Sequence, residues 1–264
     1  MSRSNPVDEV KNPAKRFYEW NGSNGCFTYY DKMQEKNVEV KLPFTFLVLD
    51  QLSTVKGWND ASESGIYSNE VRNLKKEMMT VKAFKGGQIA QGFYSEIKDR
   101  VKAEGGKFTS SVYIAVKNPE TNELEIANLQ LSGAAVNAWM DFKKEVSSLY
   151  EGAVTVTDFV EGKKGSITFK VPKFKMGKVS PQTDIAAKDL DKTLQSYFKV
   201  YFADKVVRED EPLHPQPDNA KEADYMEAQA EFAKRQSNVT QDPFTDETVD
   251  LGHSDVGYSE DVPF

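Results

Sequence analysis

Alternating apolar and polar residues, in runs joined by tight turns, are the feature that most restricts the fold of this chain. Residues 107–116 and 123–131 both alternate with the period of two that is typical of strands. The segment between them, 118–122, has the composition of a turn, so the two runs should form a hairpin. A second hairpin is expected over 153–174, around its two glycines. Strands joined in this way favour an antiparallel sheet over a parallel one separated by regular helices.

Other segments add strands and helices to this pattern. Residues 38–50 and 78–85 are rich in β-favouring side chains, and Pro43 suggests an edge or a bulge in the first of them. Helical spacing of apolar residues occurs in three places: Ile89 to Val101, residues 136–150 and residues 183–202. The sequence therefore predicts a mainly β fold with inserted helices (α+β), built as a small, twisted β-barrel with decorations.

Composition divides the chain near residue 208. From Glu209 onward three basic residues stand against fifteen acidic ones, a net charge of −12, whereas residues 1–208 carry 31 basic and 26 acidic residues, a net charge of +5. Residues 208–220 hold three prolines and few apolar side chains, so burial there cannot offset the chain entropy lost on folding. We expect three parts: an N-terminal arm or first strand over 1–36, a body over 37–207 and a disordered acidic tail over 208–264.

The residue inventory argues against an enzyme. Both histidines, His214 and His253, lie in the tail, so the body lacks the imidazole of a catalytic triad or of a zinc site with histidine ligands. Cys26 is the one cysteine, which excludes an intrachain disulfide and suits a reducing compartment. No glycine pair fits a phosphate-binding loop or a dinucleotide-binding fingerprint. We expect no catalytic residue, no cofactor and no metal.

The same inventory gives an expected location. No apolar run approaches the roughly 20 residues that a membrane span needs. The first residues, MSRSNPVDEVKNPAKRF, lack the apolar stretch of a secretory signal. We therefore expect a cytoplasmic protein without a membrane partner.

Lysines interleaved with aromatic rings suggest a surface for single-stranded nucleic acid. Cations follow phosphates and release counterions, while rings stack on unpaired bases. The segment 57–77 looks like a long polar loop that exposes a tryptophan, and three strand faces carry lysine beside an aromatic residue. The candidate contacts are Trp58, Arg72, Lys75, Lys82, Phe84, Lys107, Tyr113, Lys170, Lys173, Phe174 and Lys175. Each ring named here could instead pack in the core. The lysines could instead only keep an exposed strand soluble.

The last residues of the chain, SEDVPF, place three apolar residues behind an acidic tail. A basic, aromatic-bearing β body followed by such a tail resembles the single-stranded DNA-binding proteins of bacteria and their phages, whose ends read Asp-Asp-Ile-Pro-Phe or close to it. The resemblance implies an OB-fold body that wraps unpaired DNA and a tip that recruits replication, recombination and repair enzymes such as a polymerase, helicase or primase. The matching tip residues are Glu260, Asp261, Val262, Pro263 and Phe264. The body is longer than the usual bacterial OB domain and the linker is acidic, which points to a phage-encoded member.

The sequence thus favours a non-enzymatic protein that coats single-stranded DNA without strong sequence preference. Two alternatives remain open. One is an RNA-binding protein or nucleic-acid chaperone, because no sequence feature indicates whether the protein distinguishes RNA from DNA by the 2′-hydroxyl. The other is an adaptor in replication or recombination that binds only proteins through the tip. In the leading interpretation, the acidic tail would also compete with DNA for the basic body. The oligomeric state does not follow from the sequence.

Overall fold

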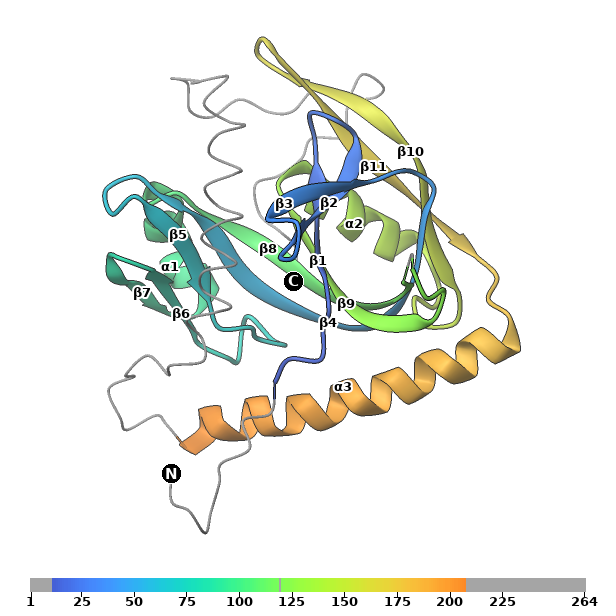
Figure 1. The fold of residues 1–264 in the computed structure, drawn as a ribbon. Coiled ribbons are helices and arrows are strands. Elements are labelled where there is room, and N and C mark those ends of the chain that lie inside the picture. The colour runs from blue at the N-terminus through green and yellow to red at the C-terminus, as the bar shows by residue number, and fades with distance from the viewer. Residues whose placement is uncertain (1–10, 119, 208–264) are drawn as a thin grey trace.

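A computed structural model describes residues 11–118 and 120–207, which form a mainly β fold with helices (Figure 1). The first strands are β1 (Phe17–Asn21), β2 (Cys26–Asp31), β3 (Lys36–Val40), β4 (Phe44–Asn59), β5 (Ser64–Ser68), β6 (Met79–Ala83) and β7 (Gly87–Gly92). Helix α1 (Tyr94–Ala103) then leads to β8 (Gly106–Lys117) and β9 (Leu124–Ser132). Helix α2 (Ala134–Glu145), the hairpin of β10 (Ala153–Lys164) and β11 (Ile167–Gly177), and helix α3 (Pro181–Val207) complete it.

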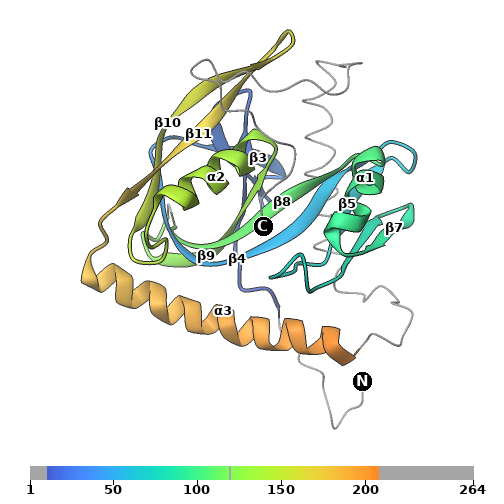
Figure 2. The same cartoon turned by 180° about the vertical axis from the view of Figure 1, so that it is seen from behind.

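One large sheet contains all of these strands, in the order β3-β2-β1-β9-β8-β4-β5-β6-β7, with β10 and β11 branching from β4. The β1–β9 pair is parallel and the other ladders are antiparallel. The 16-residue β4 pairs with β10 near its start, with β8 along most of its length and with β5 near its end. Strand β4 is thus the common spine of two lobes that lie on opposite sides in Figures 1 and 2.

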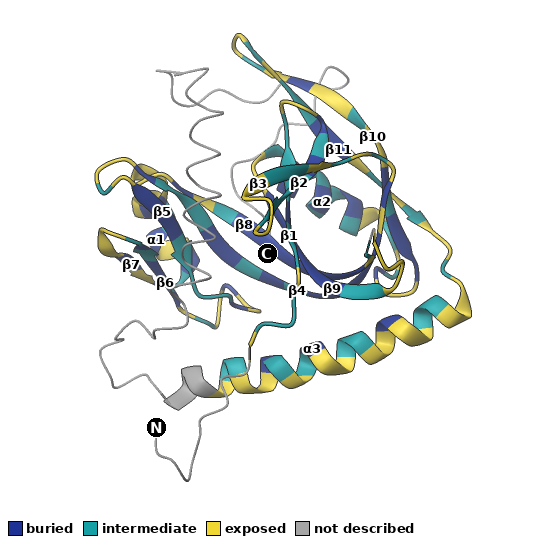
Figure 3. Cartoon of the chain, viewed as in Figure 1, coloured by how far each residue is buried: buried dark blue, intermediate teal, exposed yellow. Residues whose placement is uncertain are grey.

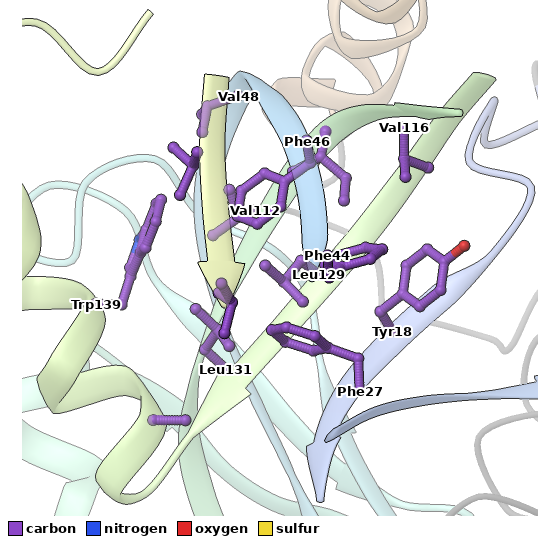
Figure 4. Close-up of a cluster of buried hydrophobic side chains, with 14 of the residues drawn as sticks. Tyr18, Phe27, Phe44, Phe46, Val48, Val112, Val116, Leu129, Leu131 and Trp139 are labelled. Carbon is purple, nitrogen blue, oxygen red and sulfur yellow. The ribbon is translucent and has the colours of Figure 1, made fainter. Parts of the chain in front are cut away.

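The larger lobe curls around a core that α2 fills from one side. Figure 4 shows aromatic rings from β1, β2 and β4 converging with valines and leucines of β8 and β9. Trp139 of α2 is 0% exposed and donates a 3.1 Å hydrogen bond from Nε1 to Oε1 of Gln51. The curl comes close to closing on itself, because the backbone N–H of Lys170 in β11 donates to the carbonyl oxygen of Gly22, between β1 and β2, at 2.7 Å.

The smaller lobe is made of β5, β6, β7 and α1. Its core is a second cluster, in which Val55, Ile66 and Val81 pack with Ile97 and Val101 of α1. The apolar spacing predicts Ile89 and Ile97 in one helix, but Ile89 lies in β7 and α1 begins only at Tyr94. Both isoleucines enter one cluster, so their spacing reflects a shared core rather than one helix face.

Helix α3 covers the face of the sheet that looks away from α2. Leu194 and Phe198 are 0% and 2% exposed, and they pack against Leu47, Leu49 and Ala115. The opposite side of the helix is exposed, as the alternating colours along it in Figure 3 indicate. Within the described residues, no helix is both long and apolar enough to cross a membrane.

One further segment differs from the expectations, and another adopts one of the two alternatives expected for it. Residues 57–77 are not one long loop, because 57–59 end β4 and Ser64–Ser68 form β5. Residues 17–31, within the segment left open as an arm or a strand, form β1 and β2, and their rings Tyr18 and Phe27 lie in the core. The tail expected over 208–264 lies outside the described residues.

Candidate nucleic-acid interface

One face of the smaller lobe gathers lysines and aromatic rings. Cross-strand partners in a sheet share a face. Lys56 of β4 pairs with Tyr67 of β5 and Lys107 of β8, and Tyr67 pairs in turn with Lys82 of β6. Alternation adds two rings to the same side, Trp58 in β4 and Phe84 directly after β6. We call this set the lysine–aromatic face: Lys56, Trp58, Tyr67, Lys82, Phe84 and Lys107.

The rings of Tyr67 and Phe84 form the centre of this face. Their centroids are 4.7 Å apart with an interplanar angle of 38°, and both rings are partly exposed. The residues that alternate with them, Ile66 and Ala83, are buried in the lobe core, which fixes the direction of the two rings. Tyr67 is absent from the sequence-based candidates because the polar composition of residues 57–77 predicts a loop there. The alternation within SGIYS, Ser64–Ser68, is the signal that could have found it.

Trp58 is held at the end of β4 by two close backbone approaches. A Cβ on Gly57 would come within 2.2 Å of the Gly105 carbonyl oxygen, and one on Gly105 would come within 2.1 Å of the Trp58 carbonyl oxygen. Gly105 also has a φ of +89°, which favours glycine. The glycine pair after α1 therefore does more than end the helix, because it lets β8 begin directly beside Trp58.

The lysines of this face differ in their exposure and in how far other groups of the protein neutralise their charge. Lys56 Nζ bonds to Glu19 of β1 and to the side-chain oxygen of Gln130 in β9, so its charge is partly neutralised by the protein itself. Lys107 is exposed and Lys82 partly exposed. The latter two are the better placed to meet phosphates.

A shallow pocket of about 480 Å³ lies in the same lobe. Lys85 and Arg100 line it together with Ser62 and Gly86. Glu104 also lines it, but one oxygen of this carboxylate accepts a 2.8 Å bond from Asn59 Nδ2. The pocket adds two cationic side chains to the lobe that carries the lysine–aromatic face.

Tyr113 does not offer an exposed ring, contrary to the expectation. It is 0% exposed because α3 covers this part of β8, and its ring meets Phe198 edge-on at 5.0 Å. Its hydroxyl donates to Glu70 at 2.9 Å and accepts from Asn12 Nδ2 at 3.1 Å. Burial and the neighbouring Glu70 carboxylate raise the pKa of Tyr113 well above its usual value. Alternation alone gave the correct face of the strand but could not reveal the helix that covers it.

Arg72 contacts the protein rather than projecting alone into solvent. Its guanidinium forms a 2.8 Å ion pair with Asp50 and lies 5.1 Å and 5.2 Å from the ring centroids of Phe198 and Phe202. These contacts tie the segment before β6 to α3, so Arg72 has a structural role that the sequence did not suggest. Lys75, in the same connection, is exposed.

The candidates of β11 lie on the other lobe and separate into two kinds. Phe174 is partly exposed and packs against Trp139 and Phe142 of α2, with ring centroids 5.0 Å and 5.7 Å apart, so its ring already has aromatic partners within the protein. Lys173 and Lys175 are exposed on either side of it, and Lys173 faces Asp158 across the ladder. Lys170 lies 4.8 Å from the Phe159 ring centroid and opposite Glu161.

Comparison with known proteins gives no relative from which the role of this surface could be inferred. The chain matches no family model, no curated protein and no solved structure. What the surface can do therefore follows from its own side chains.

Among residues 11–118 and 120–207, no group of three or more His, Cys, Asp or Glu side chains is arranged to hold a metal ion. The tip residues Glu260, Asp261, Val262, Pro263 and Phe264 lie outside the described residues.

Proposed function

We propose that this protein binds single-stranded DNA without strong sequence preference and coats it during DNA replication, recombination or repair, in the cytoplasm of a bacterium and as a phage-encoded protein. The observation that carries the proposal is the partly exposed Tyr67–Phe84 ring pair on a face that also bears Lys82 and Lys107. Rings stack on any base and lysines neutralise any phosphate, so such a face suits binding that ignores sequence.

Strand connectivity supports an OB-fold interpretation of the larger lobe. Strands β4, β8 and β9 form a meander, α2 follows, and the β10–β11 hairpin returns to pair β10 with β4. This is the path expected of a five-stranded, partly open barrel, with β4, β8, β9, β10 and β11 as its strands. Strands β1 to β3 would then fill the gap between β9 and β11, and β5 to α1 would be an insertion after the first strand.

The OB interpretation agrees with the position of the candidate residues. OB-folds bind oligonucleotides on the face of their second and third strands and with the loops after the first and fourth. Here half of the lysine–aromatic face, Tyr67, Lys82 and Phe84, belongs to the insertion after β4. Lys163, Lys164 and Lys170 belong to the β10–β11 hairpin. Helix α3 covers part of β8 and β9, which supports a DNA path that uses the uncovered end near Lys107.

The tip would supply the second half of the function. In this proposal Glu260 to Phe264 recruit a polymerase, helicase or primase, with the acidic residues steering approach and the Phe264 ring entering an apolar pocket on the partner.

A titration of fluorescent dT oligomers of increasing length, at 50 and 200 mM salt, tests the proposal. We expect binding that tightens with oligomer length up to the site size and weakens with salt, because released counterions drive it. Tyr67→Ala and Phe84→Ala should each cost about 1 to 3 kcal/mol of binding free energy through lost stacking. Lys82→Gln should weaken binding at low salt and reduce the salt dependence by about one counterion.

Two controls make this test specific. Tyr150→Ala removes a ring that is 56% exposed and lies outside the lysine–aromatic face, and it should leave affinity unchanged. Competition by poly(dT) and poly(U) separates DNA from RNA preference. If no labelled oligonucleotide binds at low salt, the protein-only adaptor replaces this proposal.

A further inference from the structure

An apolar groove with a basic rim lies in the larger lobe, away from the lysine–aromatic face. It has a volume of about 720 Å³ and lies beside the edge strand β3 and the first turn of α3. Its apolar lining comes from Tyr29, Val38, Val40, Pro43, Leu124 and Val179. Within the described part of the chain, no residue that lines it belongs to the lysine–aromatic face or to the smaller pocket near Lys85.

The charges around this groove are mainly positive. Lys41, Lys117 and Lys178 line it and are exposed, while Glu39 is the one acidic residue among the described residues that line it. Asn24 Nδ2 donates to Glu39 Oε1 at 2.5 Å. The site therefore combines apolar walls with a net positive rim, which fits an apolar peptide that is preceded by acidic residues.

We propose that this groove binds the segment Glu260–Phe264 of the same chain. The segment supplies what the groove lacks: two carboxylates at Glu260 and Asp261 for the lysines, and Val262, Pro263 and Phe264 for the apolar walls. The ring of Phe264 is the main apolar group, and Pro263 reduces the entropy lost when the peptide is held. The tip is then kept on its own body until a partner with a better pocket takes it.

The length of the chain permits this contact. The groove reaches Thr183 in α3, and residue 208 follows the end of that helix at Val207. At 1.5 Å per residue the helix covers about 36 Å between these points. The 52 residues between Val207 and Glu260 can span roughly 170 Å when extended, several times this distance. With an effective concentration on the order of 1 mM, an intrinsic Kd of about 0.1 mM would keep about nine-tenths of the tips docked.

Methyl NMR on the full chain without DNA tests the proposal. Phe264→Ala should shift the methyl resonances of Val38, Val40 and Val179 and leave those of Val81 in the other lobe in place. The matched control is Phe244→Ala, because Asp242-Pro243-Phe244 repeats the acid, proline and phenylalanine in the same tail. Shifts with Phe244→Ala in place of Phe264→Ala, or no shift at the groove with either variant, would overturn the proposal.

A second variant tests the rim without disturbing the core. Lys41→Gln, Lys117→Gln and Lys178→Gln together should weaken docking about tenfold and move the groove resonances towards their Phe264→Ala positions. The same change at the exposed Lys76, Lys102 and Lys199 removes equal charge elsewhere and should have no such effect. Equal effects of both triple variants would mean that overall charge, not the groove, holds the tip.

The proposal uses the same tip as the proposed function but depends on neither DNA nor a partner protein. The described residues of the groove and of the lysine–aromatic face do not overlap. Adding dT oligomers should therefore leave the methyl resonances of the groove at the positions they have when the tip is docked. A failed DNA titration would therefore not affect this result, and an empty groove would not affect the DNA titration.

Discussion

Tyr113 shows how one side chain can couple the folded state to pH. In the folded protein, burial first and the Glu70 carboxylate second raise the pKa of this phenol above its ordinary value of 10.0. In the unfolded chain the phenol loses its proton near pH 10. Above that pH the folded state binds more protons than the unfolded state, so the stability of the fold falls as pH rises.

We predict that Tyr113→Phe reduces this pH dependence. The free energy of unfolding of the native protein should fall above pH 10 by up to about 1.4 kcal/mol per pH unit for each such tyrosine. Tyr18, whose pKa burial also raises, contributes in the same direction and remains in the variant. Urea unfolding between pH 8 and 11.5 measures the difference in slope. Tyr150→Phe, at a ring that is 56% exposed, serves as the control, and an unchanged slope in Tyr113→Phe would contradict the prediction.

The aromatic rings of the candidate interface differ in whether a helix packs against them, not in residue type. Phe84 and Phe174 both lie near lysines in the sequence and both are partly exposed, but Phe174 packs against α2 whereas Phe84 packs against Tyr67 on the surface of the sheet. Alternation along a strand reports the face of a side chain and nothing about a helix packed on that face. The sequence could therefore predict Lys82, Phe84 and Lys107 as separate candidates, but neither the strand pairing that brings them to one face nor the helices that pack on Tyr113 and Phe174.

At the level of elements, α3 behaves as part of the core of the body. Its buried residues pack on β4, β8 and β9, and Arg72 joins it to the segment before β6 through Asp50 and two aromatic rings. The apolar residues over 183–202 predicted this helix correctly, since α3 spans Pro181–Val207. Which face of the sheet it covers depends on long-range packing, which local spacing does not report.

We predict that Phe198→Ala lowers the free energy of unfolding by about 3 to 5 kcal/mol, because it leaves a cavity against Tyr113 and removes a ring beside Arg72. The matched control is Val200→Ala on the same helix, where the side chain is 42% exposed and the cost should stay within about 0.5 kcal/mol. Chemical denaturation of both variants gives the comparison. Equal losses would mean that α3 does not depend on its buried face.

The hairpins show which elements local sequence determines well. The β8–β9 and β10–β11 hairpins lie where the alternation and turn residues predicted them. The position of β1 beside β9, more than a hundred residues later in the chain, had no local signal. Strand order across such distances depends on how whole faces pack together, so the sequence predicted the mainly β class but not the eleven-stranded sheet.

At the scale of the whole molecule, charge separates the chain into two parts with opposite tendencies. Residues 1–208 carry a net charge of +5 and the remainder a net charge of −12. A tethered polyanion competes with DNA phosphates for the same cations, because its effective concentration near the body is high. Competition of this kind depends on the number of acidic residues rather than on the tip, which distinguishes it from docking in the groove.

We predict that deleting residues 209–264 tightens binding to oligo(dT) several-fold at 50 mM salt. The gain should shrink at 200 mM, because screening weakens the attraction of the tail for the lysines. Fluorescence titrations of the shortened and full chains at both salt concentrations measure it. Phe264→Ala retains all fifteen acidic residues of the tail and should bind oligo(dT) as the native chain does. Equal affinities for the shortened and full chains would show that the tail does not compete with DNA, whereas a gain from Phe264→Ala alone would place the competition in the tip.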